Sequence, residues 1–360
     1  MKKLIILQTV SPSYRNKLFL YISNILKDQF DFYSGDSYFE SSVKSDFSFH
    51  KRIQVSNFFI FKRKLLFQIG MWSIIFSNNL LIIEMNPRII SNWMILFIRK
   101  ILNRKTILWG HAWPRNGMNS KSDKLRNFMR SLGDEIIVYT KTQQIELQER
   151  MPNKHIYSAC NSLYSTSEMI TNDSYQSSQN IIYVGRLTEM KKPFFLLKTF
   201  HCIIDKLPKD VNLLIVGEGP EKLKMEEYIE KNNLNKRVSL FGHIDDYKIL
   251  KELYFSSLFS VSPGYVGLSI TQSFGFGVPM IVSEFENHSP EIEAVHEKDN
   301  SIFFKTDDIK NLSQQIFSMY ENKDYWLNQR TSIVETCKKQ YSIESMGSTF
   351  IKLFDKHTMF

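Results

Sequence analysis

The sequence predicts an α/β protein with two domains, each built on a parallel sheet. Short apolar runs alternate with segments of helical spacing, an order typical of parallel strands joined by crossover helices. Four apolar runs within about one hundred residues of the second half end at a glycine, where a strand leaves the sheet. A length of 360 residues favours two such domains over one.

The composition is that of a globular protein in a reducing compartment. The hydrophobic fraction of 43% suffices for a full core. The three cysteines, Cys160, Cys202 and Cys337, are widely spaced and odd in number, which predicts a reducing compartment and no metal cluster. The apolar run at residues 4–7 is too short for a signal peptide, and no run reaches the about 18 residues of a membrane-spanning helix. We therefore expect a cytoplasmic protein.

Charge is distributed unevenly between the two halves. Residues 1–165 hold 24 Lys and Arg against 11 Asp and Glu, a balance of +13. Residues 166–360 hold 22 against 26, a balance of −4. A basic half indicates an anionic partner such as nucleic acid, phospholipid headgroups or a phosphorylated substrate. No nucleic-acid recognition motif accompanies the charge, so that partner is not expected.

In the first half, two residues lie where ligands bind in folds with parallel sheets, at the carboxyl edge. Strands are predicted at residues 4–9, 30–33, 53–55, 80–84, 106–109 and 134–139. Arg15 follows the first strand, at the start of a helix over 14–27, and either holds an anionic acceptor or is a solvated helix residue. His111 follows the strand at 106–109 and is either structural or part of an active site.

Two stretches of the first half combine basic and aromatic residues. Residues 58–76 and 88–105 carry Phe and Trp beside Lys and Arg, and residues 51–105 contain ten Lys and Arg but one acid, Glu84. Basic aromatic helices lie in membrane interfaces, so these stretches predict contact with an anionic membrane surface. The alternative is that they are core helices whose basic residues are merely solvated.

The second half begins after a polar linker at 165–180. A strand ends at Gly185, and two cations, Arg186 and Lys191, follow it before a helix over 194–207. Arginine forms forked hydrogen bonds to phosphate oxygens and lysine supplies a mobile charge, so the pair suits a diphosphate. Further strands end at Gly217 and Gly242, the latter followed by His243.

The stretch at 258–282 predicts a strand, a turn, about ten helical residues stopped by Gly277, and another strand. Gly267 and Leu268 lie where the loop becomes the helix. Free backbone N–H groups there favour a phosphate. An ordinary strand-turn-helix is the alternative.

Taken together, these motifs resemble those of the retaining glycosyltransferases of family 4, the glycosyl transferases group 1. The resemblance is strong over 180–320 and looser in the first half. The motifs that carry it are Val184-Gly185-Arg186-Leu187 with Lys191, Val216-Gly217-Glu218-Gly219-Pro220, Leu240-Phe241-Gly242-His243, and Gly267-Leu268 with Gly277-Val278-Pro279.

The resemblance implies the GT-B architecture, in which two Rossmann-like domains with parallel sheets face each other across a cleft. It implies an acceptor-binding domain at 1–165, a nucleotide-sugar-binding domain at 166–340, and a helix at 341–360 that crosses back to the first domain.

The resemblance also implies roles for single residues. Arg186 and Lys191 hold the diphosphate of a nucleotide sugar with the backbone at Gly267 and Leu268, and His111 reaches the donor sugar. Gly185, Gly217, Gly242 and His243 line the donor site, the last two near the base. The acceptor is implied to be a lipid-linked saccharide at the inner face of the cell membrane.

The sequence departs from the family pattern at its central motif. Members carry two glutamates eight positions apart, and here those positions hold Gly264 and Gln272. The Gln272 amide can hydrogen-bond ribose hydroxyls, but Gly264 offers no carboxylate to the sugar. Either the donor sugar is unusual, for example a deoxy or amino sugar, or the backbone near Val266 replaces the missing group. His288 and Glu291 are also candidate substitutes, the alternative being a loop whose helix cap is Ser289.

The expected reaction is sugar transfer with retention, without a metal or other cofactor, because no acidic metal motif is evident and fixed cations can stabilise the departing diphosphate. The expected pathway is surface polysaccharide or glycolipid biosynthesis, such as lipopolysaccharide or capsule. Two alternatives remain open: a nucleotide-sugar epimerase of the same architecture, and a non-catalytic nucleotide-sugar-binding partner protein.

Overall fold

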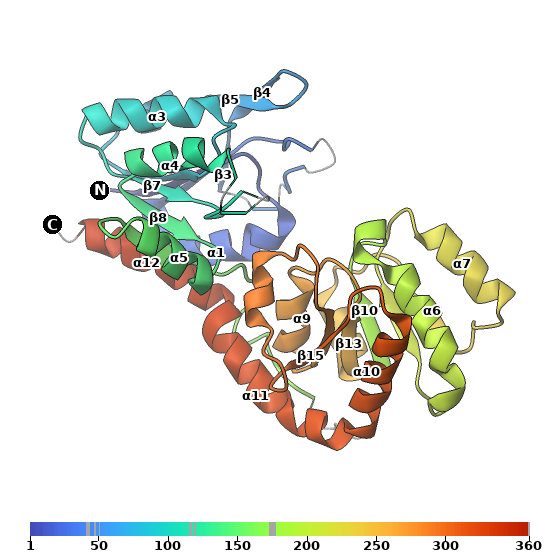
Figure 1. Ribbon diagram of the computed structural model, residues 1–360. Coiled ribbons are helices and arrows are strands. Elements are labelled where there is room, and N and C mark those ends of the chain that lie inside the picture. The colour runs from blue at the N-terminus through green and yellow to red at the C-terminus, as the bar shows by residue number, and fades with distance from the viewer. Residues whose placement is uncertain are drawn as a thin grey trace. The chain divides into compact units, whose positions relative to one another are not determined.

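The computed structural model describes residues 1–40, 44–46, 48–49, 51–114, 117–118, 120–172 and 178–358, in two compact units (Figure 1). The first unit comprises Met1–Leu163 and Ile343–Phe360, and the second comprises Tyr164–Ser342. Each is an α/β unit with a parallel sheet. Among the residues described, no helix has the length and apolar content needed to cross a membrane.

The first unit is built on a seven-stranded parallel sheet of order β3-β2-β1-β6-β7-β8-β9. The strand order reverses between β1 and β6, and such a reversal marks the usual ligand edge of an open parallel sheet. The strands are β1 (Leu4–Gln8), β2 (Phe30–Ser34), β3 (Arg52–Gln54), β6 (Leu80–Glu84), β7 (Thr106–Trp109), β8 (Glu135–Val138) and β9 (His155–Ser158). The main helices are α1 (Asn16–Leu26), α3 (Ile90–Ile101), α4 (Asp123–Leu132), α5 (Lys141–Arg150) and α12 (Ile343–Thr358).

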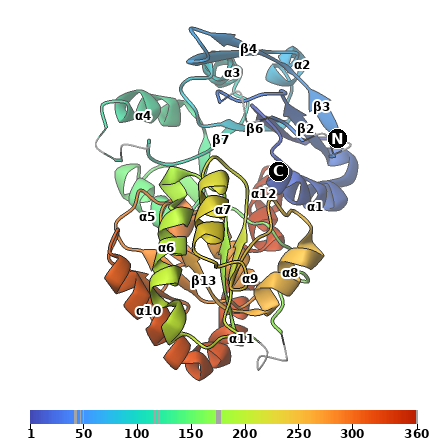
Figure 2. The same ribbon diagram turned by 90° about the vertical axis from the view of Figure 1, so that its right-hand side faces the viewer.

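The second unit has a six-stranded parallel sheet of order β12-β11-β10-β13-β14-β15, which reverses between β10 and β13. Figure 2 views the unit from the side of α6 and α7. The strands are β10 (Asn180–Val184), β11 (Leu213–Val216), β12 (Val238–Leu240), β13 (Ser257–Ser262), β14 (Met280–Ser283) and β15 (Ser301–Phe304). The helices are α6 (Pro193–Ile203), α7 (Lys222–Lys231), α8 (Tyr247–Phe255), α9 (Ser269–Gly275), α10 (Ile309–Glu321) and α11 (Lys323–Tyr341).

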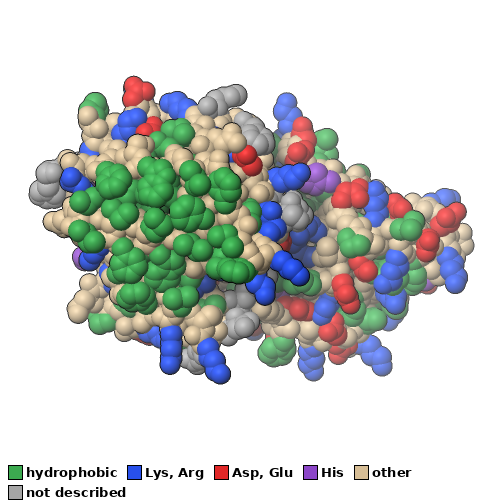
Figure 3. All heavy atoms as spheres, turned by 90° about the horizontal axis from the view of Figure 1, so that it is seen from above, with side chains coloured by type: hydrophobic (Ala, Val, Ile, Leu, Met, Phe, Trp, Pro, Cys, Tyr) green, Lys and Arg blue, Asp and Glu red, His purple; other side chains and the backbone are tan. Residues whose placement is uncertain are grey.

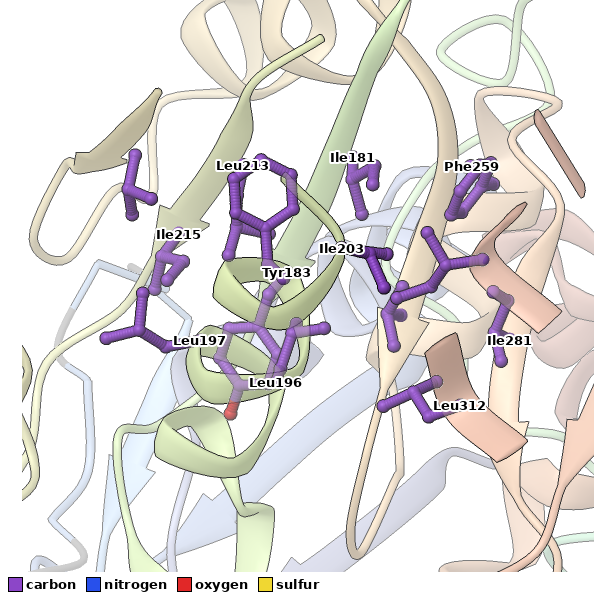
Figure 4. Close-up of a cluster of buried hydrophobic side chains, with 14 of the residues drawn as sticks. Ile181, Tyr183, Leu196, Leu197, Ile203, Leu213, Ile215, Phe259, Ile281 and Leu312 are labelled. Atoms are coloured by element: carbon purple, nitrogen blue, oxygen red, sulfur yellow. The ribbon is translucent and has the colours of Figure 1, made fainter. Parts of the chain in front are cut away.

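The core of the second unit lies between its sheet and α6, α7 and α10 (Figure 4). Tyr183 of β10 lies beside Leu196 and Leu197 of α6, and Ile181 of the same strand belongs to the same cluster. These strands are apolar over most of their length because both faces of a parallel sheet are covered. The carboxyl ends of the strands are therefore held in fixed positions by a closely packed interior.

The prediction of a basic aromatic helix over 58–76 is wrong. The segment forms an antiparallel hairpin of β4 (Ser56–Ile60) and β5 (Leu65–Ile69), followed by the single-turn helix α2 (Trp72–Ile75). Residues 56–60 alternate between exposed and half-buried, the period-two pattern of a strand, and the apolar residues on both faces conceal this alternation. The helix predicted within 88–105 is present as α3.

The last helix, α12, packs on α1 in the first unit (Figure 1). Phe350 stands edge-on to Trp109, with ring centroids 4.8 Å apart. The ammonium of Lys356 lies 2.6 Å from the carboxylate of Glu135. Gly347 allows the close approach, because a Cβ there would overlap the ring of Tyr21. The closing segment of the chain thus completes the core of the first unit.

Candidate functional site

Three glycines that were predicted to line the donor site, Gly185, Gly217 and Gly242, come together at the carboxyl ends of β10, β11 and β12. The N–H of Gly185 donates to Val216 O at 3.0 Å, and the N–H of Gly217 donates to Gly242 O at 2.7 Å. A Cβ on Gly217 would overlap the carbonyl oxygen of Gly185. Glycine is needed here so that the backbones leaving neighbouring strands can touch, which leaves an edge that a ligand can approach closely. His243 follows Gly242 and is exposed.

The two predicted cations follow β10 at the same edge. Arg186 is exposed, whereas Lys191 ends the 3₁₀ turn η4 (Glu189–Lys191) and is half-buried. The Lys191 ammonium lies 4.8 Å from the ring centroid of Tyr265. Burial, assisted by the charge of Arg186, lowers the pKa of Lys191 to about 8, and Glu291 partly opposes this shift. An anion bound between the two cations would relieve their repulsion.

The loop after β13 packs directly against the Lys191 turn. The N–H of Tyr265 donates to Met190 O at 2.9 Å. A Cβ on Gly264 would overlap that same carbonyl oxygen and would lie 2.9 Å from the carbonyl carbon of Lys191. Position 264 therefore cannot hold a glutamate for a steric reason, since no side chain fits there while the Lys191 turn keeps its place.

Gly267 and Leu268 lie at the start of α9, which has seven residues and not the ten predicted. Gly267 packs against the loop after β14, since a Cβ there would lie 3.1 Å from Ser289 Oγ. The N–H of Ser289 donates to Val266 O at 2.9 Å. As the alternative predicted, Ser289 is the N-cap residue of a helical segment, the 3₁₀ helix η6 (Pro290–Ala294). Its side chain makes no capping hydrogen bond, because its hydroxyl pairs with the hydroxyl of Tyr265.

His288 and Glu291 lie in this loop but differ in their surroundings. His288 Nδ1 accepts from the N–H of Val266 at 3.2 Å, and Nε2 donates to Ser283 O at 2.9 Å. Burial lowers the pKa of His288, which favours the neutral ring that this pair of bonds requires. Both ring nitrogens thus connect β14 to the Val266 loop, and a direct contact with the donor sugar stays a prediction. Glu291 is buried and lies close enough to Lys191 that its charge opposes part of the fall in the pKa of the lysine.

Gln272 lies among aromatic side chains on α9. Its Nε2 donates to Tyr164 Oη at 2.9 Å, and its Oε1 accepts from the hydroxyl of Tyr254 at 3.4 Å. The rings of Tyr164 and Tyr254 in turn pack on Phe276. The amide is therefore held in one orientation, and the predicted contact with ribose hydroxyls would use the hydrogen-bonding capacity that these tyrosines leave.

In the first unit, Arg15 and His111 are both neighbours of Tyr139. The Arg15 guanidinium donates to Tyr139 Oη at 2.8 Å and to Gln8 Oε1 at 3.1 Å. It also lies 4.5 Å from the ring centroid of Trp109. His111 is exposed, and its ring centroid is 4.6 Å from that of Tyr139. The alternative in which Arg15 is a solvated helix residue is wrong, because the side chain is buried and hydrogen-bonded.

The reversal point of the first sheet carries a carboxylate that sequence reasoning missed. Glu84 ends β6, and its two oxygens accept from the backbone N–H and the hydroxyl of Thr9, each at 2.7 Å. Burial raises the pKa of Glu84, although these hydrogen bonds oppose the shift. The signal was present in the sequence, since Glu84 is a charged residue at the end of an otherwise apolar strand.

Residues 167–340 match the family of glycosyl transferases group 1. The second unit is a group 1 glycosyltransferase domain. The whole chain is similar to the Anabaena Alr3699/HepE structure in complex with UDP, with a TM-score of 0.71, 11% identity, and coverage of 98% of this chain and 100% of that one. With the two parallel-sheet units, this likeness shows the GT-B fold.

Curated relatives of this group 1 glycosyltransferase domain cover part of the chain. An uncharacterized glycosyltransferase of Methanocaldococcus jannaschii, MJ1059, is 26% identical over 60% of this chain and 58% of its own length. The amylovoran biosynthesis glycosyltransferase AmsD of Erwinia amylovora is 28% identical over 46% of this chain and 44% of its own length. The matched segments thus span about half the length of these relatives.

Within the described part of the chain, no group of three or more His, Cys, Asp and Glu side chains is arranged to hold a metal ion. Lys191 and Arg186 are the cations that follow β10 at the carboxyl edge of the second sheet. Both cations were predicted from the sequence, but three tyrosines were not. Tyr265 contacts Lys191, and Tyr164 and Tyr254 hold Gln272. These tyrosines belong to no motif that the sequence displays.

Proposed function

We propose that the protein transfers a sugar from a nucleotide-sugar donor to a saccharide acceptor with retention of anomeric configuration. The observation that carries this proposal is the position of Lys191. Its ammonium is half-buried against Tyr265, beside Arg186 and the converging glycines of the second sheet. A nucleoside diphosphate is the anion that suits two adjacent cations at the ligand edge of such a sheet.

The same cations can lower the barrier to transfer. As the bond from the sugar to the diphosphate breaks, negative charge gathers on the departing phosphate oxygens. Lys191 and Arg186 are already in place, so no solvent has to reorganise to stabilise that charge. Because these residues supply the positive charge, we propose that transfer needs no metal ion. The resemblance to retaining enzymes supports retention.

Donor contacts are assigned to the loops that leave the second sheet. Gly242 and His243 border the base, Gln272 the ribose, and the backbone at Gly267 and Leu268 the phosphates. Since no side chain fits at position 264, Glu291 is the carboxylate proposed to contact the sugar, assisted by the backbone at Val266. Its burial next to the Lys191 turn supports this assignment.

The acceptor is proposed to bind the first unit at the reversal point of its sheet. His111 is exposed there, and we propose that it takes part in catalysis, while Arg15 and Glu84 shape the floor of the site. A lipid-linked saccharide at the inner face of the cell membrane is the acceptor class proposed. The similarity to a glycosyltransferase of amylovoran biosynthesis supports a role in surface polysaccharide synthesis.

We expect selective thermal stabilisation of the purified protein by one nucleoside diphosphate. A ligand at one hundred times its dissociation constant adds about 2.7 kcal/mol to the free energy of unfolding. UDP is expected to give the largest shift, since a solved structure of the same fold holds UDP. The matching nucleosides, which lack the diphosphate, serve as controls. An absence of stabilisation by every nucleotide would contradict the donor site.

Product analysis tests the reaction itself. With donor and acceptor present, we expect an NMR coupling constant that shows the donor's anomeric configuration kept in the product, at a rate that EDTA leaves unchanged. A nucleotide sugar epimerised without any acceptor would indicate the epimerase alternative. Nucleotide binding with no turnover on any saccharide or lipid-linked acceptor would indicate a non-catalytic partner protein.

A further inference from the structure

The β4–β5 hairpin presents an apolar face to solvent. On its inner face the amide of Gln68 donates to Asn57 Oδ1 at 2.9 Å, so these two polar side chains point inward, beside Phe59 and Leu66. Facing strands pair Phe58 with Phe67 and Ile60 with Leu65. An exposed strand face is normally polar, whereas the exposed face of this hairpin is mostly apolar. The outward side chains are the polar Ser56 and the apolar Phe58, Ile60, Leu65, Phe67 and Ile69.

Helices α3 and α4 extend this apolar surface. On α3, Trp93, Phe97 and Ile101 recur every four residues and form one stripe, within which Ile101 is 84% exposed. The ring of Phe128 on α4 lies 5.8 Å from that of Trp93 and 6.3 Å from that of Phe97. Figure 3 shows hydrophobic side chains gathered over this part of the first unit, with Lys and Arg at several points of their margin and acidic side chains at its upper edge. We call this surface the apolar face.

The hairpin tip is fixed in place with an aromatic residue outermost. Phe61 is 71% exposed, and Phe61, Lys62 and Arg63 all have positive φ, between 51° and 63°. Arg88 donates to the carbonyl oxygens of Lys64 and Arg63 at 2.8 and 2.9 Å. Arg63 in turn donates to the carbonyl oxygens of Tyr38 and Phe39. Two guanidinium groups therefore hold a tight turn that displays Phe61 to solvent.

The segment that supplies the hairpin and α3, residues 51–105, is strongly basic. These residues include ten Lys and Arg but a single acid, Glu84. The oxygens of Glu84 accept hydrogen bonds from Thr9 at the edge of the sheet. Lys62, Lys64 and Lys100 are exposed. Two copies joined through this face would bring like charges together, which disfavours a dimer. A surface that is apolar in its middle and anionic around it is the complement of this face.

We propose that the apolar face inserts into the interface of a membrane that contains anionic lipids. Phe61, Phe97 and Phe128 enter the boundary between headgroups and acyl chains, while Lys62, Lys64 and Lys100 contact lipid phosphates. This inference deepens the proposed function, because it would bring the enzyme to a lipid-linked acceptor. Only that link to the acceptor rests on the proposed function. It replaces the two predicted helices by a defined surface of one hairpin and two helices.

Flotation of the full-length protein with vesicles tests the proposal. We expect binding to vesicles of phosphatidylcholine with phosphatidylglycerol and weak binding to phosphatidylcholine alone. The double variant Lys62→Ala/Lys64→Ala should bind about thirtyfold more weakly, since each basic residue near an anionic surface contributes about fivefold in affinity. Phe61→Ser and Phe97→Ser should each weaken binding at least about tenfold. Leu223→Ser and Lys209→Ala, exposed positions of the second unit, are matched controls and should bind like the wild type.

Other outcomes would overturn the proposal. Equal loss in the controls, or no binding by the wild type, would remove the membrane as the occupant. A dimer in analytical ultracentrifugation that Phe61→Ser dissociates, without vesicle binding, would assign the face to a second copy. UDP stabilisation measured in the same variants keeps the two proposals separate, because it depends on the second unit alone and should not change.

Discussion

Replacing Lys191 with alanine is expected to lower the rate of sugar transfer about a hundredfold, the usual cost of removing one preorganised group that stabilises a developing negative charge. The effect should fall mainly on kcat, because the charge on the departing diphosphate grows in the transition state. Steady-state kinetics with saturating donor measure it. Lys192→Ala is the matched control, because the Lys192 ammonium is bound to Glu286 and Asp307, each at 2.6 Å, and should change kcat little.

The same lysine should give transfer a pH dependence. Burial lowers the pKa of Lys191 to about 8, so the free enzyme carries the charged form below that pH and loses it as the pH rises. The profile of kcat/KM should therefore fall above pH 8, and the fall should be absent from the Lys191→Ala variant. An unchanged profile in that variant would show that another group titrates.

Replacing Gly264 with alanine should also lower transfer about a hundredfold. A methyl group at 264 would overlap Met190 O, so the Lys191 turn has to move, and a displacement of about 1 Å in a positioning group costs on this order. Kinetics and nucleotide affinity should both change, since the turn positions Lys191 in the ground state as well.

A double-mutant cycle shows whether the glycine acts through the lysine. If it does, Gly264→Ala should cost much less in the Lys191→Ala background than in the wild type. Thermal unfolding of both single variants is the control for general loss of structure. Additive losses in the cycle would mean that Gly264 affects the donor site by another route.

Strand exits were predictable from the sequence, whereas the hairpin was not. Gly185, Gly217 and Gly242 each follow an apolar run. A glycine there lets the backbone turn and pack closely where the strand ends, so its position can be recognised in a single sequence. The hairpin has Phe59 and Leu66 on its inner face and other apolar residues outside, so alternation is invisible in the letters. Only the pairing of β4 with β5 reveals it.

Side-chain roles that depend on distant partners were the least predictable. Arg15 contacts Tyr139, 124 positions along the chain, and Gln272 contacts Tyr164, 108 positions away. His288 was a candidate for sugar contact because of its residue type, and its bonds to Val266 and Ser283 follow from the packing of two loops. Residue type and spacing identified the edge of the sheet, and the tertiary structure decides which atoms remain for a ligand.

The place of α12 has a consequence for how the protein is made. The ribosome completes the second unit before it releases residues 343–358, yet these residues close the core of the first unit through Phe350 and Lys356. During synthesis, the nascent first unit exposes the apolar side chains of α1 that α12 later covers, among them Leu18 and Ile22. A fragment that stops after residue 163 would keep that surface exposed and should aggregate. Folding of the first unit can therefore be completed only after the second unit has been synthesised.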